Sequence, residues 1–224
     1  MMGQCFTVSL FFVLLASFCS LATADLMDDY LSLPGSYQFV RREPEGATST
    51  RVVMTVFEDF LCPACYRTVT EMLPPLQEKY KERLEVRYVA YPLVHEESRL
   101  PARVYVIAQN MGLGKEMQAA LFRASFEEQL DTASRGGLAR VADSIGLDPE
   151  ELFSRLDKGE GNSEVDSNLA LGQSYRIEAV PGIVFDGWIM AKDITPDNLE
   201  KIIAGLLERK RETTPKGKKP VSRK

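Results

Sequence analysis

The sequence predicts an α/β fold in which a small sheet is flanked by helices and interrupted by a helical insertion. Segments with the pattern of strands occur early in the chain, at residues 36–40, 52–57 and 84–91, and again late, at 183–190. Between them, residues 98–172 carry apolar side chains at helical spacing. The predicted order is therefore β-β-α-β, then about four helices, then β-β-α.

The first half of the fold consists of three strands and one helix. Residues 36–40 are expected to form an edge strand, and residues 52–57 are apolar on both faces, as in a central strand. Apolar residues between 65 and 80 recur at helical spacing, which predicts a helix with a kink at Pro74. Alternating apolar side chains predict the strand at 84–91.

The second half begins with the insertion and ends with a hairpin and a helix. Apolar periodicity predicts helices at residues 101–111, 115–126, 138–145 and 152–156, with a further one at 165–171. Asp186-Gly187 between two short apolar segments indicates a hairpin with a type I′ turn. Thr195 followed by proline is expected to cap the final helix.

Residues 1–24 are predicted to be a signal peptide. Residues 1–23 carry no charged side chain, their centre is strongly apolar, and Ala22-Thr23-Ala24 fits the small-x-small cleavage pattern. No lysine or arginine precedes the apolar segment, so a retained membrane anchor is the alternative. Either reading places the following domain, residues 25–208, in an exported compartment.

Residues 209–224 are predicted to be a basic, disordered tail. They hold eight lysines and arginines against one acid, Glu212, and contain two prolines and a glycine. The alternatives are that the tail folds back on the acidic body of the protein or touches anionic lipid. Nucleic acid is not an expected partner, because the tail has no aromatic residues.

Cys62 and Cys65 form a Cys-Pro-Ala-Cys motif where a predicted strand gives way to a helix, and they are the only cysteines after residue 24. This arrangement is typical of reversible disulfide chemistry. Cys62 is expected to begin the helix, where unpaired amides and the helix dipole stabilise a thiolate. We therefore expect Cys62 to be the exposed, attacking sulfur and Cys65 to be its buried partner one turn later.

Other roles for the cysteine pair fit less well. A structural disulfide across so small a loop would stabilise little, and a zinc site needs about four ligands, whereas only His95 could join the cysteines without using carboxylates. No metal or cofactor is therefore expected. Glu58 and Asp59 could assist proton transfer to Cys65, but the favoured interpretation is that both are solvated loop carboxylates.

Three segments, taken in order, resemble the DsbA-like branch of the thioredoxin superfamily. They are the active-site segment at 57–65, Tyr91-Pro-Leu-Val-His95 before the helical insertion, and the Val-Pro loop and hairpin at 179–187. The resemblance covers roughly residues 38–207. It implies a thioredoxin fold with a helical insertion, and a role in forming or reshuffling disulfides in exported proteins.

The resemblance also implies roles for single residues. Pro181 corresponds to a cis-proline that faces the cysteines, and the backbone of Val180 would pair with an extended substrate like an added strand. Pro63 and Ala64 would border the same substrate. Many oxidising members have histidine where this chain has Ala64, so we expect the pKa of Cys62 in the upper part of the range of about 3.5 to 7.5. Many members also carry a buried acid six residues before the first cysteine, where this chain has Val56.

The predicted function is that of an exported, periplasmic thiol–disulfide oxidoreductase, a monomer that oxidises dithiols in cysteine-containing client proteins through Cys62 and Cys65. The resemblance implies a membrane oxidase that would recycle it. Two alternatives remain: a disulfide reductase or isomerase using the same cysteines, and a non-catalytic binding module or chaperone.

Overall fold

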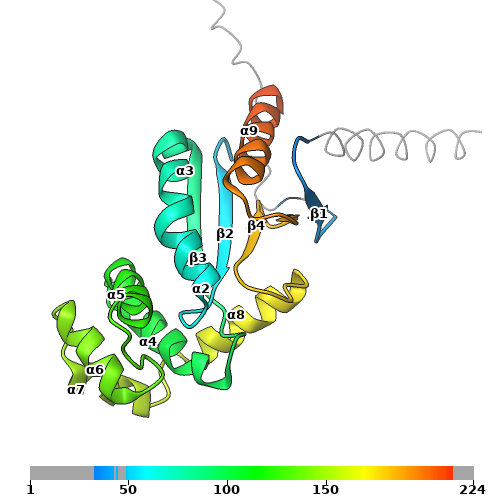
Figure 1. Ribbon diagram of the computed structural model, residues 1–224. Helices are drawn as coiled ribbons and strands as arrows, with labels where there is room; N and C mark the ends of the chain where they lie inside the picture. The colour runs from blue at the N-terminus through cyan, green and yellow to red at the C-terminus, as the bar shows by residue number, and fades with distance from the viewer. Residues whose placement is uncertain (1–32, 43, 45–48, 214–224) are drawn as a thin grey trace, which may run out of the picture. The chain divides into compact units, whose positions relative to one another are not determined.

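The computed structural model describes residues 33–42, 44 and 49–213 (Figure 1). The chain divides into two compact units, residues 1–35 and 36–224, and the fold is that of the second unit. The predicted signal peptide and residues 214–224 of the predicted tail lie outside the described residues.

Five strands form one mixed sheet with the order β1-β5-β4-β2-β3. Strand β2 lies between β3, to which it is parallel, and β4, to which it is antiparallel. The short strand β1 pairs antiparallel with β5 at the edge, so the predicted edge and central strands are both confirmed. The strands are β1 Tyr37–Phe39, β2 Val52–Glu58, β3 Leu84–Ala90, β4 Gly182–Phe185 and β5 Ile189–Ala191.

Five helices form the insertion between β3 and β4, where the sequence predicted about four. In Figure 1, helices α4 to α7 form a bundle beyond one end of the sheet, while α3 and α9 run beside the strands. A 3₁₀ turn at Lys81–Arg83 precedes β3, and another at Glu96–Ser98 precedes the insertion. The helices are α2 Pro63–Arg67, α3 Leu73–Tyr80, α4 Arg99–Asn110, α5 Gly114–Phe126, α6 Arg135–Ser144, α7 Pro149–Asp157, α8 Asn162–Ser174 and α9 Pro196–Thr213.

The predicted kink near Pro74 takes the form of a π-helical segment, Thr68–Met72, between α2 and α3. The amide of Leu73 donates to the carbonyl of Thr68, five residues earlier, which widens the turn. Proline has no amide hydrogen for the helical ladder, so a break in the α-helical pattern just before Pro74 costs little.

The turn between β4 and β5 confirms the predicted type I′ hairpin. Asp186 and Gly187 both have positive φ values, 46° and 71°, and the amide of Trp188 donates to the carbonyl of Phe185 at 3.1 Å. The indole of Trp188 is buried and packs against Phe39 with 5.0 Å between ring centroids. The hairpin thereby supports the edge strand.

Helix α9 extends to Thr213, so the predicted boundary of the tail at residue 209 is wrong. Lys210, which the prediction assigned to the tail, lies 3.1 Å from a carboxylate oxygen of Asp186. Both side chains are largely buried, and the other oxygen of Asp186 accepts from the amide of Val53. This tertiary ion pair ties the end of the helix to the hairpin and to β2.

No helix within the described ranges is both long and apolar enough to span a membrane. The leader, for which the sequence leaves a membrane anchor as an alternative, lies outside those ranges.

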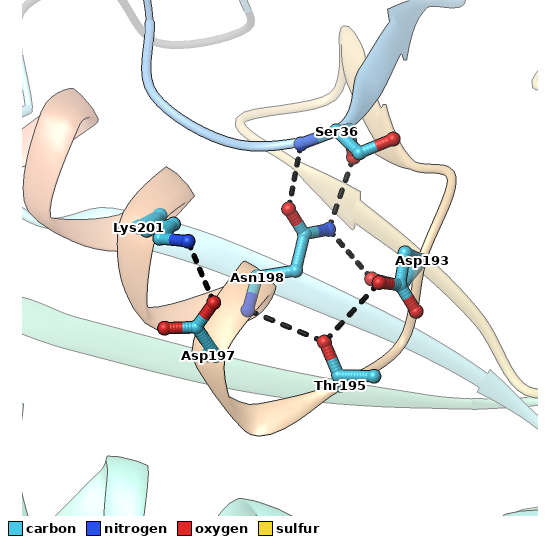
Figure 2. Close-up of polar contacts among 6 residues, drawn as sticks. All are labelled: Ser36, Asp193, Thr195, Asp197, Asn198 and Lys201. Atoms are coloured by element: carbon cyan, nitrogen blue, oxygen red, sulfur yellow. Dashed lines mark hydrogen bonds and ion pairs between the residues drawn. The ribbon is translucent and has the colours of Figure 1, made fainter.

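The start of α9 is joined to the chain before β1 by the side chain of Asn198 (Figure 2). Its oxygen accepts from the amide of Ser36 at 2.6 Å, and its nitrogen donates to the carbonyls of Ser36 and Asp193 at 3.0 and 2.6 Å. The amide of Asn198 donates to the hydroxyl of Thr195, the predicted capping residue. The buried side-chain amide of Asn198 therefore joins the edge of the sheet to the start of α9.

Replacing Asn198 with Ala is expected to lower the free energy of unfolding by about 2 kcal/mol, because buried backbone groups lose their partners. Urea denaturation measures this change. Lys201→Ala is the matched control on the same helix: it removes only an exposed ion pair with Asp197 (Figure 2) and should stay close to wild type. Equal stability of the two variants would contradict the assignment.

Candidate active site

The cysteine motif lies at the start of helix α2, as predicted. Cys62 is the N-cap residue with extended backbone angles, φ −96° and ψ 114°, and Pro63 is the first helical residue. The amide of Cys65 donates to Cys62 Sγ at 3.3 Å, so the sulfur takes the place of the usual capping oxygen. Cys62 and Cys65 are in the reduced state in this structure, with no disulfide between them.

Cys62 is more buried than the sequence suggested. Cys65 is fully covered, as expected, but Cys62 is only 5% exposed, so the prediction of an exposed attacking sulfur is wrong in degree. The cover comes from the hydrophobic cluster that also contains Phe60 and residues of the insertion such as Phe122. Only a small part of Cys62 is therefore accessible to a reacting partner.

The pKa values of the two cysteines are shifted in opposite directions. The side chain of Cys65 donates a hydrogen bond to Cys62. This bond, together with those from the amides of Cys65 and Ala64, lowers the pKa of Cys62 to about 6, although burial and the nearby charge of Asp59 act to raise it. The same hydrogen bond, together with burial, raises the pKa of Cys65. At neutral pH Cys62 is therefore mainly a thiolate and Cys65 a thiol.

The loop before β4 brings the other predicted site residues to the cysteines. The peptide bond between Val180 and Pro181 is cis, and the carbonyl oxygen of Val180 lies 3.6 Å from Cys62 Sγ. Pro63 is exposed and Ala64 half-buried beside the same sulfur. The structure thus brings together residues that lie about 118 positions apart in the sequence.

Glu58 is buried, so the prediction of a solvated carboxylate is wrong. Its Oε1 accepts from Nε2 of Gln118 on helix α5 at 2.6 Å, whereas Oε2 has no partner among the described residues. Burial raises the pKa of Glu58 to about 8, although the bond from Gln118 acts in the opposite direction. When it is ionised, Glu58 also helps to raise the pKa of Cys65, so the two groups interact electrostatically.

The sequence contained a signal for this burial. Glu58 follows Val56 by two residues in the same strand, and alternate residues of a strand lie on one face. The prediction ended the strand at residue 57, but β2 continues through Glu58. Gln118, by contrast, was not identified, because helical spacing gives no indication of a partner 60 residues away.

Asp59 is also buried, which corrects the second prediction of a solvated carboxylate. Its carboxylate accepts from the amide of Leu61 at 2.9 Å and from the amides of Leu93 and Val94, both at 2.8 Å. Three donors to one carboxylate offset the cost of burying its charge. Asp59 is therefore a brace between the active-site turn and the loop that follows β3.

An aromatic cluster joins helix α2 to the insertion. The ring of Tyr66 stacks on Phe126 with 5.1 Å between centroids, and its hydroxyl donates to Glu127 at 3.0 Å. His95 is the N-cap residue of the 3₁₀ turn before the insertion, where its amide donates to the hydroxyl of Ser98 at 3.3 Å. Among the described residues, no group of three or more His, Cys, Asp or Glu side chains could hold a metal ion.

Residues 53–204 match the family model of the DSBA-like thioredoxin domain. The chain belongs to this family. The match spans both halves of the sheet and the helical insertion between them, so the predicted DsbA-like thioredoxin fold is confirmed.

Solved structures of this fold resemble the chain closely in shape and weakly in sequence. The oxidoreductase DsbA from Xylella fastidiosa superposes with a TM-score of 0.67 at 18% identity, covering 79% of this chain and 96% of that one. DsbA from Pseudomonas aeruginosa gives 0.65 at 19% identity, covering 80% and 93%. DsbA from Proteus mirabilis, in complex with a non-covalently bound peptide PWATCDS, gives 0.59 at 19% identity, covering 80% and 96%. No curated protein sequence matches the chain.

The pKa of Cys62 should depend on the donor that Cys65 supplies. In Cys65→Ala the main cause of the lowered pKa is gone, so the pH midpoint of iodoacetamide alkylation should rise from about 6 towards the ordinary value of 9.0. Cys65→Ser keeps a hydroxyl donor at the same place and is the matched control, with a smaller rise. Equal midpoints for both variants would contradict a role for the side-chain bond.

Glu58 should make the stability of the fold depend on pH. Its pKa is raised from 4.5 to about 8 in the folded protein, so between these values the folded state retains a proton that the unfolded state has lost. The free energy of unfolding should therefore fall as pH rises from 4.5 to 8, by at most about 1.4 kcal/mol per pH unit.

In Glu58→Gln, a neutral side chain of similar shape, this fall should disappear, as urea denaturation across the pH range will show. Glu82→Gln, at an exposed glutamate in the turn before β3, is the control and should retain the wild-type dependence. A parallel pH dependence in wild type and Glu58→Gln would refute the assignment.

Proposed function

We propose that the protein is an exported thiol–disulfide oxidoreductase that oxidises pairs of thiols in client proteins through Cys62 and Cys65. The observation that carries the proposal is that the side chains of Cys62 and Cys65 are hydrogen-bonded to each other and have pKa values shifted in opposite directions. The pKa of Cys62 is lowered to about 6, and that of Cys65 is raised. A stabilised Cys62 thiolate favours the reduced pair, and a pair that prefers to be reduced oxidises others.

The reaction proceeds in two exchanges. A client thiolate attacks Cys62 Sγ of the Cys62–Cys65 disulfide, forming a mixed disulfide and releasing Cys65 as a thiolate, which takes up a proton. A second client thiolate then attacks the client sulfur of the mixed disulfide, and Cys62 leaves as a thiolate. The client gains one disulfide and loses two electrons, which the cysteine pair accepts.

Glu58 is the proposed proton donor for the departing Cys65. The Cys65 thiolate forms in a fully buried place, where an unneutralised charge is costly. Glu58 is buried, interacts electrostatically with Cys65, is protonated at neutral pH because of its raised pKa, and has one carboxyl oxygen without a partner among the described residues. The insertion takes part through Gln118, which holds the other oxygen.

Client binding is proposed at the edge formed by Val180 and Pro181, with Pro63 and Ala64 bordering the opposite side of the sulfur. Val180 is half-buried and its carbonyl oxygen lies 3.6 Å from Cys62 Sγ, where an amide of an extended client chain would bind. The peptide complex of the Proteus mirabilis protein, which shares the fold, supports a cysteine-containing peptide as the ligand.

The cellular setting belongs to the same proposal. The uncharged, apolar leader and its cleavage pattern support export, and family membership supports the periplasm and a membrane redox partner that resets the disulfide. We propose that the protein acts as a monomer. Cysteine-containing proteins that have just been exported would be its clients.

The test combines a turnover assay with an equilibrium. Oxidised wild-type protein should introduce disulfides into reduced, unfolded ribonuclease, and Cys62→Ala should not. Equilibration of the Cys62–Cys65 pair with glutathione should give an oxidising potential. A strongly reducing potential, with activity in insulin reduction, would reverse the direction to a reductase or isomerase. Activity equal to that of Cys62→Ala in every thiol assay would leave a non-catalytic binding module.

A further inference from the structure

The segment that carries the proposed client-binding edge belongs to no helix or strand. Residues 177–181 lie between helix α8 and strand β4, and within them Ile177 is buried, whereas residues 178 and 179 are exposed. A client can pair with the Val180 carbonyl only if that carbonyl keeps its place relative to Cys62. A segment without regular hydrogen bonding needs other contacts to hold it there.

Ile177 anchors this segment. Its side chain packs over Gly182, the first residue of β4, where an added Cβ would lie only 2.8 Å from Cγ2 of Ile177. The two ends of the segment are therefore in contact. Val180 packs against the hydrophobic cluster that contains Ile177, and also against the cluster that contains both cysteines. The position of Ile177 therefore determines where Val180 lies relative to the cysteines.

Tyr91 binds Ile177 from the residue that follows β3. Its hydroxyl donates to the carbonyl of Ile177 at 3.2 Å, although the two residues lie 86 positions apart in the sequence. The amide of Tyr91 donates to the carbonyl of Glu58, the last residue of β2, at 2.7 Å. One buried residue thus joins the strand that leads into the cysteine motif to the segment that carries Val180.

The ring of Tyr91 is held by close packing. It lies edge-to-face against Phe57, with 5.6 Å between ring centroids. It also lies against Gly172 of helix α8, where an added Cβ would come within 2.7 Å of Cζ of the ring. Glycine at this position leaves the room that the ring needs. The hydroxyl is therefore held in one place and can set the position of the carbonyl that it binds.

We propose that Tyr91 is a positioning residue for client binding: its bond to Ile177 holds the Val180 carbonyl where a client backbone can pair with it beside Cys62. This role presupposes the proposed function. Tyr91 is only 2% exposed, so it acts on the client through the segment and not by direct contact. Its effect should fall on clients that pair through their backbone, and a small dithiol, which has no backbone amide, should react independently of it.

The test compares two reductants of the oxidised protein, a short unstructured peptide with two cysteines and dithiothreitol. The ratio of their second-order rate constants separates backbone pairing from the thiol chemistry of Cys62 and Cys65, which both reactions share. Tyr91→Phe keeps the ring and loses the hydrogen bond to Ile177, so the ratio of peptide to dithiothreitol should fall about fivefold. The pH midpoint of Cys62 alkylation should stay at about 6.

Gly172→Ala is a second, independent variant. Its added methyl group would displace the Tyr91 ring, while alanine suits the interior of helix α8 better than glycine does, so the ratio should fall here too. Tyr105→Phe is the matched control. It removes another buried hydroxyl, which accepts from Gln109 at 2.9 Å within helix α4, and it should keep the wild-type ratio.

An unchanged ratio in Tyr91→Phe or in Gly172→Ala would overturn the inference, as would a fall in Tyr105→Phe as large as that in Tyr91→Phe. Circular dichroism and the rate with dithiothreitol verify that each variant is folded and reactive. If the wild-type protein does not oxidise the peptide at all, the proposed function itself fails, so the two failures are distinguishable.

Discussion

The hydrogen bond between Cys65 and Cys62 is the interaction on which the rest of the site depends. It requires Cys62 to stand at the N-cap of α2, with Cys65 one turn later, and its main consequence is the lowered pKa of Cys62. The sheet fixes that geometry, because the turn that carries Cys62 follows directly on the central strand β2. The insertion covers the cysteine pair, since Phe60 and both cysteines pack into a hydrophobic cluster with side chains of α4 and α5. The thioredoxin-like half of the fold positions the sulfurs, and the helical half controls their contact with water.

Most of the fold could be predicted because its elements are recorded in local patterns. The central strand is apolar on both faces, the insertion helices have apolar residues at helical spacing, and the Asp186-Gly187 turn has the residues that positive φ values require. The extension of α9 could not be predicted in this way. Residues 209–213 are rich in charge, which favours a solvated tail, but the buried pairing of Lys210 with Asp186 gives this end of the helix a tertiary contact. That contact joins residues far apart in the sequence, and no local rule contains it.

In the candidate site, too, the features carried by local sequence patterns could be predicted and those set by tertiary contacts could not. The cysteine motif and the Val180–Pro181 loop are short segments with recognisable chemistry, and the structure brings them together. Glu58 and Asp59 were assigned to solvent because acidic residues are rarely buried without partners. The rule holds, but the partners come from elsewhere: the amide of Gln118, 60 residues away, and the amides of Leu93 and Val94, about 34 residues away. A carboxylate's environment is a tertiary property, so sequence reasoning identified the acids and misjudged their surroundings.

Burial of the redox pair has a consequence for the kind of client it can serve. With 5% of Cys62 exposed and the Val180 carbonyl oxygen 3.6 Å from Cys62 Sγ, little of the residue is open to an approaching sulfur. Disulfide exchange needs the attacking sulfur close to Cys62 Sγ, so a cysteine recessed in a folded surface cannot reach it without a clash. A flexible, extended segment can, because it pairs its backbone with the loop and turns its side chain inward. On the proposed function, the cover that excludes water from Cys65 is therefore also what restricts the enzyme to chains that have not yet folded.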